Sequence, residues 1–166
     1  MKKILILILL IAIIPAFAFA DLQIGGIALY NGDTSTTTSL NMARLAVGAE
    51  ARLKLWILQG GISALYVPNP KKPSIAALTD VGLALDILFL RFGAGIGPNF
   101  SFTPSGAIKL ASAGLNLKLS GELIVGPFCV GLVGYYYLKD VNEFSKLGSK
   151  FQKLPWLGVT AMLKLF

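Results

Sequence analysis

Residues 44 to 57 read RLAVGAEARLKLWI, with an apolar residue at every second position. The positions between them hold all the charges of the segment, on Arg44, Glu50, Arg52 and Lys54. Side chains of a β-strand point alternately to the two faces of a sheet, so the pattern predicts a strand with one apolar and one charged face. In an outer-membrane barrel, the apolar face meets lipid and the charged face lines the interior.

The composition favours lipid as the surroundings of this chain, because 55% of its residues are hydrophobic and only 14% are charged. Helices and closed barrels are the structures that satisfy every backbone hydrogen bond in hydrocarbon. The best charge-free windows for a helix, 55–68 and 123–138, contain Gly or Pro. Both are shorter than the roughly 20 residues that a helical span needs. We therefore expect a barrel rather than a two-helix protein.

The first twenty residues have the layout of a secretory signal peptide. Lys2 and Lys3 precede an apolar run over 4–14, and small residues stand at Ala18 and Ala20. We expect cleavage after Ala20, with an uncleaved anchor as the alternative. A single domain over 21–166 follows.

Alternating segments recur along this domain and predict eight strands. We expect strands at 22–30, 43–56, 57–67, 78–88, 89–99, 110–119, 122–137 and 156–166. Tight turns are expected at 56–57, 88–89 and 120–121, and long loops at 31–42, 68–77, 101–109 and 139–155. The predicted fold is an all-β, eight-stranded antiparallel, transmembrane up-and-down barrel. The phase of the run from Leu123 to Tyr137 stays open, since both of its faces are apolar.

Folding the chain about Leu88-Phe89 sets Asp86 opposite Arg91, both pointing inward. The same reasoning on the other strands predicts a network of charges in the lumen. Its members are Arg44, Glu50, Arg52, Lys54, Asp80, Asp86, Arg91 and Lys118. Inward glycines are expected to leave space beside them, at positions 48, 82, 93, 95, 97 and 114.

Aromatic residues gather near the predicted strand ends, which is typical of the two girdles of a membrane barrel. Examples are Tyr30, Trp56, Tyr66, Phe89 and Trp156. Some of them could instead be ordinary core residues.

The signal peptide, the alternation over 44–57, the loop rhythm and the terminal Phe166 together resemble the small outer-membrane barrels of the OmpA, OmpX and OmpW type. The resemblance implies a monomer in the bacterial outer membrane with both termini periplasmic. It also implies that the barrel-assembly machinery reads the strand ending at Phe166. One departure is that Lys164 and Met162 stand where that signal usually has apolar residues.

No enzymatic activity is expected. The chain has no histidine, which excludes Ser-His-Asp catalysis and histidine-containing zinc sites. Its single cysteine, Cys129, lies in an apolar run and is expected to be a packed side chain. The glycines of GAGIG at 93–97 lack the spacing of a nucleotide loop. We expect no cofactor, no metal and no nucleic-acid partner.

Three functions remain open. The first is a structural or surface-interaction barrel in contact with outer-membrane lipids, whose basic extracellular loops could bind anionic glycans or host surface ligands. The loop lysines are Lys71, Lys72, Lys139, Lys146, Lys150 and Lys153. The second is a narrow channel for small solutes or hydrophobic molecules, as the resemblance to OmpW implies. The third is a secreted lipocalin-like ligand binder, whose charges would lie outside.

Overall fold

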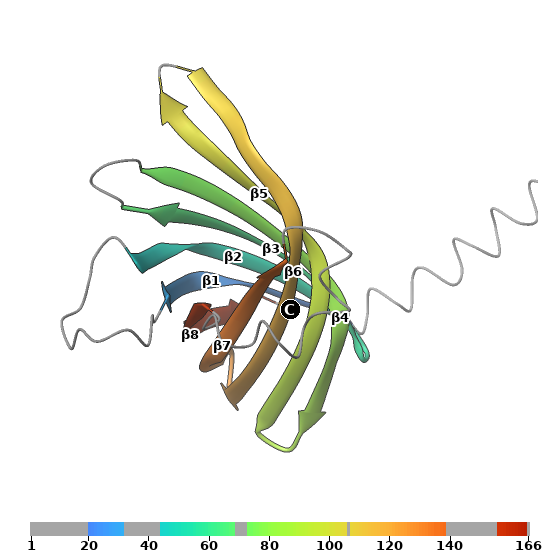
Figure 1. Cartoon of the computed structure of the whole chain (residues 1–166). Helices are drawn as coiled ribbons and strands as arrows, with labels where there is room; N and C mark the ends of the chain where they lie inside the picture. Colours follow the sequence, from blue (N-terminus) through green and yellow to red (C-terminus); the bar gives the residue numbers. More distant parts are fainter. Residues whose placement is uncertain (1–19, 32–43, 69–72, 106, 139–155, 166) are drawn as a thin grey trace, which may run out of the picture.

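The computed structural model describes residues 20–31, 44–68, 73–105, 107–138 and 156–165, except the side chains of 104–112 and 138. Eight strands form one closed, antiparallel barrel in which each strand pairs with the next and β8 pairs with β1 (Figure 1). The strands are β1 (Ala20–Asn31), β2 (Leu45–Leu55), β3 (Leu58–Val67), β4 (Ser74–Ile87), β5 (Leu90–Ser105), β6 (Ala107–Val125), β7 (Phe128–Leu138) and β8 (Trp156–Lys164). Within the described ranges no helix is long and apolar enough to cross a membrane.

Two of the three predicted tight turns are confirmed. Leu55 pairs with Leu58 around Trp56-Ile57, and Ile87 pairs with Leu90 around Leu88-Phe89. The first residue of each turn has a positive φ, 56° at Trp56 and 57° at Leu88. Glycine and asparagine favour this conformation, so Trp56 and Leu88 adopt it without the usual Asn-Gly signature of a two-residue turn.

The predicted turn at 120–121 is wrong. Ser120 and Gly121 lie inside β6, and the chain turns at Gly126-Pro127 instead, where Gly126 has a φ of 60°. Glycine adopts this conformation without strain. The apolar run on both sides of the turn hid it, because neither face there carried a polar residue that marked the phase.

The loops predicted at 68–77 and 101–109 are shorter in the structure. β4 begins at Ser74, and β5 and β6 stay paired as far as Ser105 and Ala107. A register shift between Ser101 and Phe102 lets the pairing continue past the point where the alternation breaks. The β5–β6 hairpin therefore extends beyond the other strands (Figure 1).

The barrel has two distinct ends. One end carries the three tight turns, together with the start of β1 and the end of β8: Ala20 pairs with Leu55, and the backbone of Lys164 donates to the carbonyl of Pro127. We call it the turn end and the opposite one the loop end. β1 begins at Ala20, two residues before the predicted start and at the residue after which cleavage is predicted.

The interior of the barrel is divided into a turn-end half and a loop-end half. Toward the turn end it is filled by charged and polar side chains, among them Glu50, Arg52 and Lys118, each 2% exposed. Toward the loop end it is filled by an apolar cluster. The cluster consists of Ile27, Leu29, Ala46, Leu65, Leu78, Val133 and Tyr135. Tyr135 lies at the boundary, with its ring 5.6 Å from Nζ of Lys118.

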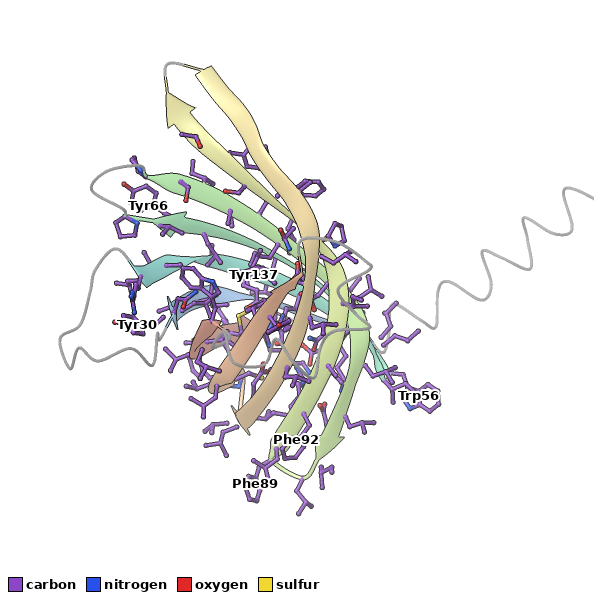
Figure 2. The ribbon with its side chains drawn as sticks, viewed as in Figure 1. Tyr30, Trp56, Tyr66, Phe89, Phe92 and Tyr137 are labelled. Carbon is purple, nitrogen blue, oxygen red and sulfur yellow. The ribbon has the colours of Figure 1, made fainter. Side chains whose placement is uncertain are left out.

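Some aromatic residues lie near the two ends of the barrel, as predicted for girdles, and others are core residues. Tyr30 and Tyr66 lie toward the loop end and Trp56 and Phe89 at the turn end, as Figure 2 shows. Tyr135, in contrast, is a fully buried interior residue. The three consecutive tyrosines of β7 thus alternate between the two faces.

Candidate functional site: the charged network of the interior

Ten charged side chains from six strands form linked ion pairs inside the turn-end half of the interior. Five are acidic and five are basic, so the formal charge of the network is balanced. The acids are Asp21, Glu50, Asp80, Asp86 and Glu122, and the bases are Arg52, Lys54, Arg91, Lys118 and Lys164.

Arg52 is the centre of the deeper part of this network. Its Nε and Nη2 donate to the two carboxylate oxygens of Glu50, at 2.7 and 2.9 Å. Its Nη1 donates to Glu122, and Nη2 also reaches Oγ1 of Thr160 at 3.2 Å. Lys118 joins Glu50 to Asp80, with 3.2 Å between its Nζ and Oδ2 of Asp80. The planar guanidinium of Arg52 binds Glu50 through two N–H donors and still has a third donor for Glu122. The ammonium group of a lysine lacks this fixed, forked arrangement of donors.

Arg91 is the centre of the part nearer the turn end. It donates to both oxygens of Asp86, at 2.7 and 3.0 Å, and to Oδ2 of Asp21 at 2.8 Å. Lys54 contacts Asp86 at 2.5 Å, and Lys164 lies 3.6 Å from Asp21. Asp21 and Lys164 come from β1 and β8, so this cluster also ties together the strands that close the barrel.

Seven of the eight residues predicted for the network are in it. The predicted pairing of Asp86 with Arg91 across the β4–β5 turn is confirmed in register and in contact. Arg44 is placed differently: it precedes β2 at the loop end and is half-buried, whereas Lys54 lies at the turn end of that strand. Ten residues along one strand correspond to about 30 Å, which separates these two positions.

Three members were missed by the sequence analysis. Glu122 was missed because the misplaced turn at 120–121 assigned it to the first position of a strand of unknown phase. Extending the strand beyond Lys118 with the same alternation places Glu122 on the inward face. Asp21 was missed because the first strand was predicted to begin at Leu22, two residues after its start in the structure, and Lys164 was considered only as part of the C-terminal signal.

At five of the six predicted inward glycines, all except Gly114, an added Cβ would lie 3.1 Å or less from another atom, so the expectation that they leave space is wrong for these five. A Cβ at Gly48 would lie 1.8 Å from the carbonyl oxygen of Ala64, and one at Gly82 would lie 1.9 Å from that of Ala94. At Gly93 it would meet Oγ of Ser120 at 2.6 Å. A small barrel curves strongly, and glycine lets neighbouring backbones approach at the bends.

The outer face of the barrel is apolar, in contrast to the charged turn-end half of the interior. None of the described outward-pointing side chains is charged, and many are large, exposed and apolar, for example Val81 and Leu132 at 68% and 69%. The lipocalin-like alternative required Glu50, Arg52 and Lys54 to lie outside, and the structure contradicts it by burying all three.

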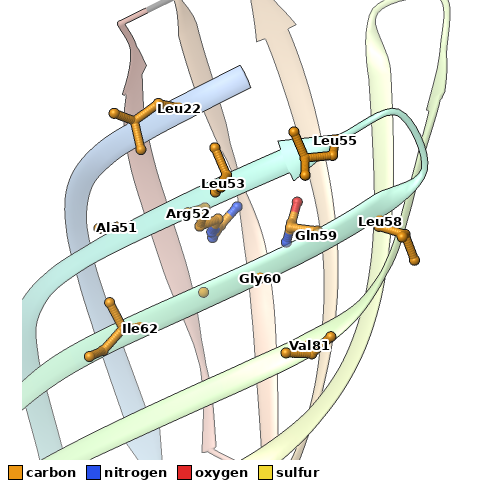
Figure 3. A pocket seen from close by; sticks show the side chains of 11 residues that line it. Leu22, Ala51, Arg52, Leu53, Leu55, Leu58, Gln59, Gly60, Ile62 and Val81 are labelled. Atoms are coloured by element: carbon orange, nitrogen blue, oxygen red, sulfur yellow. The ribbon is translucent and has the colours of Figure 1, made fainter. Parts of the chain in front are cut away.

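A hollow of about 380 Å³ lies over β1 to β4 on this outer face. Figure 3 shows Leu22, Leu53, Leu58, Ile62 and Val81 around it, with Gly60 at its centre. The absent side chain of Gly60 accounts for the hollow. Its exposed lining side chains are apolar, so it offers no reactive group.

In the described ranges, no three His, Cys, Asp or Glu side chains are arranged to hold a metal ion. Cys129 points inward from β7 and is 1% exposed.

The fold has a solved counterpart. The chain matches the crystal structure of the N-terminal β-barrel domain of OprF from Pseudomonas aeruginosa with a TM-score of 0.56. The alignment covers 88% of this chain and 96% of that domain, at 12% sequence identity.

The chain has the OprF-type barrel fold.

This likeness supports the predicted architecture of the OmpA type and says nothing of activity, because the two sequences are so different. No family model and no curated protein matches the sequence.

Proposed function

We propose that the chain is an integral protein of a bacterial outer membrane, a monomeric barrel with a closed interior that acts through its extracellular loops. The observation that carries the proposal is the balanced charged network, which occupies the space that a channel would need. The same proposal assigns no reaction to the chain, since each interior carboxylate is held in an ion pair.

The charge-free outer face supports insertion in a membrane. On β4 the outward side chains run from Ile75 to Ile87, and Thr79, the one polar residue among them, donates to the carbonyl of Pro98 at 3.0 Å. Twelve residues at ~3.3 Å each, tilted by about 40°, span roughly 30 Å along the barrel axis. This length is sufficient for the apolar band of an outer-membrane barrel, which is about 25 Å tall.

The orientation follows from export. The start of β1 and the end of β8 both lie at the turn end, and a chain exported by its N-terminal signal inserts from the periplasm. The turn end would then be periplasmic and the loop end extracellular. The six loop lysines would lie on the cell surface, although all of them fall outside the described residues.

The second candidate function, a narrow channel, needs a continuous water path past Arg52 and Arg91. Their guanidinium groups are bound to carboxylates from β1, β2, β4 and β6, which leaves neither group lining a free passage. A charge that lined a pore would need solvent at its head group, and these two residues are each 2% exposed.

Conductance distinguishes the two functions. The full chain and an Asp86→Ala variant would be inserted in planar lipid bilayers, with folding confirmed by a heat-modifiable band on a gel. We expect both to be silent, because the variant leaves the deeper cluster around Arg52 intact. Discrete conductance steps in the unaltered protein would refute the closed interior and establish the channel.

The role of the loops is tested separately. Protein in neutral lipid vesicles would be applied to immobilised heparin, a polyanionic glycan, at increasing salt. We expect retention that is lost above about 0.5 M salt, as screening shortens electrostatic attraction. Exchanging Lys139, Lys146, Lys150 and Lys153 for glutamine should abolish it, whereas exchanging Lys71 and Lys72 should only weaken it. Retention that is absent, or unchanged in the fourfold variant, would contradict a basic loop surface.

Recognition by the barrel-assembly machinery is part of the same proposal. Phe166 lies outside the described residues, and the last outward side chain before it is Leu165. Deleting Phe166 should slow assembly in cells and leave refolding into vesicles unchanged. Equal assembly of both chains in cells would show that another segment is read.

A further inference from the structure

The loop-end half of the interior contains a cavity of about 500 Å³. It lies among the inward side chains of the strand ends, with Ser74 at the start of β4, Val67 at the end of β3 and Trp156 at the start of β8. Cavities of this size are typical of small-molecule sites, which run from about 300 to 1,000 Å³.

The cavity has an apolar floor that separates it from the charged network. Leu65 and Leu78 form part of both its lining and the buried apolar cluster. Beneath them the cluster continues to Leu29 and Tyr135, neither of which has any exposed surface. The cavity is therefore a dead-end pocket that is reached from the loop end, and not a segment of a channel.

One wall is aromatic and already ordered. The rings of Tyr137 and Trp156 meet edge to face, with centroids 6.1 Å apart and planes at 80°. Both residues line the cavity and pack against the apolar cluster. Such a pair holds its shape without a ligand, so binding would lose little side-chain entropy here.

One buried hydrogen-bond donor of this lining has no partner in the described part of the chain. Nδ2 of Asn99 is buried, and no acceptor lies within hydrogen-bond reach of it in the described part of the chain. A buried donor without a partner is destabilising, and native proteins satisfy nearly all such groups. An acceptor atom brought by a ligand would satisfy this one.

None of the residues that line the cavity is charged. A charged ligand would lose its hydration there without gaining a counter-charge, at a large cost in free energy. A purely apolar ligand would fill the space and leave the amide of Asn99 unsatisfied.

We propose that this cavity binds a neutral, mostly apolar molecule with one carbonyl or ether oxygen, which accepts a hydrogen bond from Asn99. The ligand class is that of medium-chain ketones, esters and related neutral amphiphiles. The site is independent of the loop lysines and of the closed charged network, so it stands whether or not the proposed surface role is correct.

The two tryptophans of the chain make a selective assay possible. Trp56 is 79% exposed at the turn end and Trp156 lines the cavity. In a Trp56→Phe variant, Trp156 is the single emitter. The probe is an alkan-2-one with a terminal bromine atom, since bromine quenches tryptophan on contact, and its matched control is the bromoalkane without the carbonyl.

With the protein in lipid vesicles, we expect the bromoketone to quench Trp156 saturably, and about tenfold more tightly than the bromoalkane. Asn99→Leu should remove this preference and leave the affinity for the bromoalkane unchanged. Ala76→Phe should abolish saturable quenching by filling the cavity. The same exchange at Ala64, an exposed outward residue of β3, should have no effect.

Partition of the probe into lipid is controlled with the complementary Trp156→Phe variant, in which Trp56 is the emitter and quenching should rise without saturation. Non-saturable quenching of Trp156 would overturn the proposal. So would an equal affinity for ketone and alkane in the Trp56→Phe protein, a comparison that needs no change in the cavity. An absence of quenching would also overturn it, by showing that other segments of the chain already fill the space.

Discussion

Exchanging Arg52 for methionine should cost about 3–5 kcal/mol of unfolding free energy, the range measured when one partner of a buried ion pair is removed. Methionine keeps an unbranched apolar stem and removes the guanidinium. Glu50 would retain Lys118 as a counter-charge. Glu122 would lose the hydrogen bond that Arg52 donates to its Oε1, and its Oε2 has no partner at the outset. One buried carboxylate would therefore be left uncompensated.

A second substitution in the same chain restores the balance of charge. Adding Glu122→Gln to Arg52→Met removes the orphaned carboxylate and returns the network to four acids and four bases. We expect the double variant to be more stable than Arg52→Met alone by about 2 kcal/mol, since replacing both partners of a pair is less costly than removing one. Glu122→Gln by itself should be destabilising, because Arg52 would lose one of its two carboxylates.

Equilibrium unfolding by urea in phosphatidylcholine vesicles, followed by tryptophan fluorescence, measures all three variants and completes a double-mutant cycle. A cost below about 1 kcal/mol for Arg52→Met would mean that water reaches the network and screens it. A double variant less stable than Arg52→Met would also refute the reasoning, since charge balance would then have no stabilising effect.

Two further predictions concern single positions in the backbone. Gly48→Ala should lower stability by about 3 kcal/mol or more, because its Cβ would overlap the carbonyl of Ala64 and a backbone atom cannot move aside. Gly121→Ala, where nothing lies within 4 Å, should stay within about 1 kcal/mol of the parent in the same urea assay, and similar losses at both sites would contradict the packing argument. Leu88→Asn should raise stability by about 1 kcal/mol in detergent micelles, because asparagine tolerates the positive φ of this turn position. Phe89→Asn, at the turn position without a positive φ, should give no gain, and an equal gain there would assign the effect to polarity instead of strain.

The sequence by itself determined which side chains face inward and which face outward over most of the barrel. The alternation over 44–57 and 78–99 has a period of two, and a strand has no other way to arrange such a pattern once one face must avoid water. It also determined the turns at 56–57 and 88–89, because only those positions keep the apolar face continuous across the hairpin. The pairing of Asp86 with Arg91 follows from the second turn directly.

Where the pattern is ambiguous, only the tertiary structure decided how the chain folds. It also decided which charges meet across the interior. The turn at Gly126-Pro127 lies in a run that is apolar on both faces, so the alternation within that run did not locate it. The contact between Arg52 and Glu122 joins β2 to β6, which are not neighbours in the sheet. Strand tilt and barrel closure set which residues of distant strands lie at the same level, and these are properties of all eight strands together. Closure likewise decided that Gly48 and Gly82 are sites of close backbone packing rather than the lining of a pore.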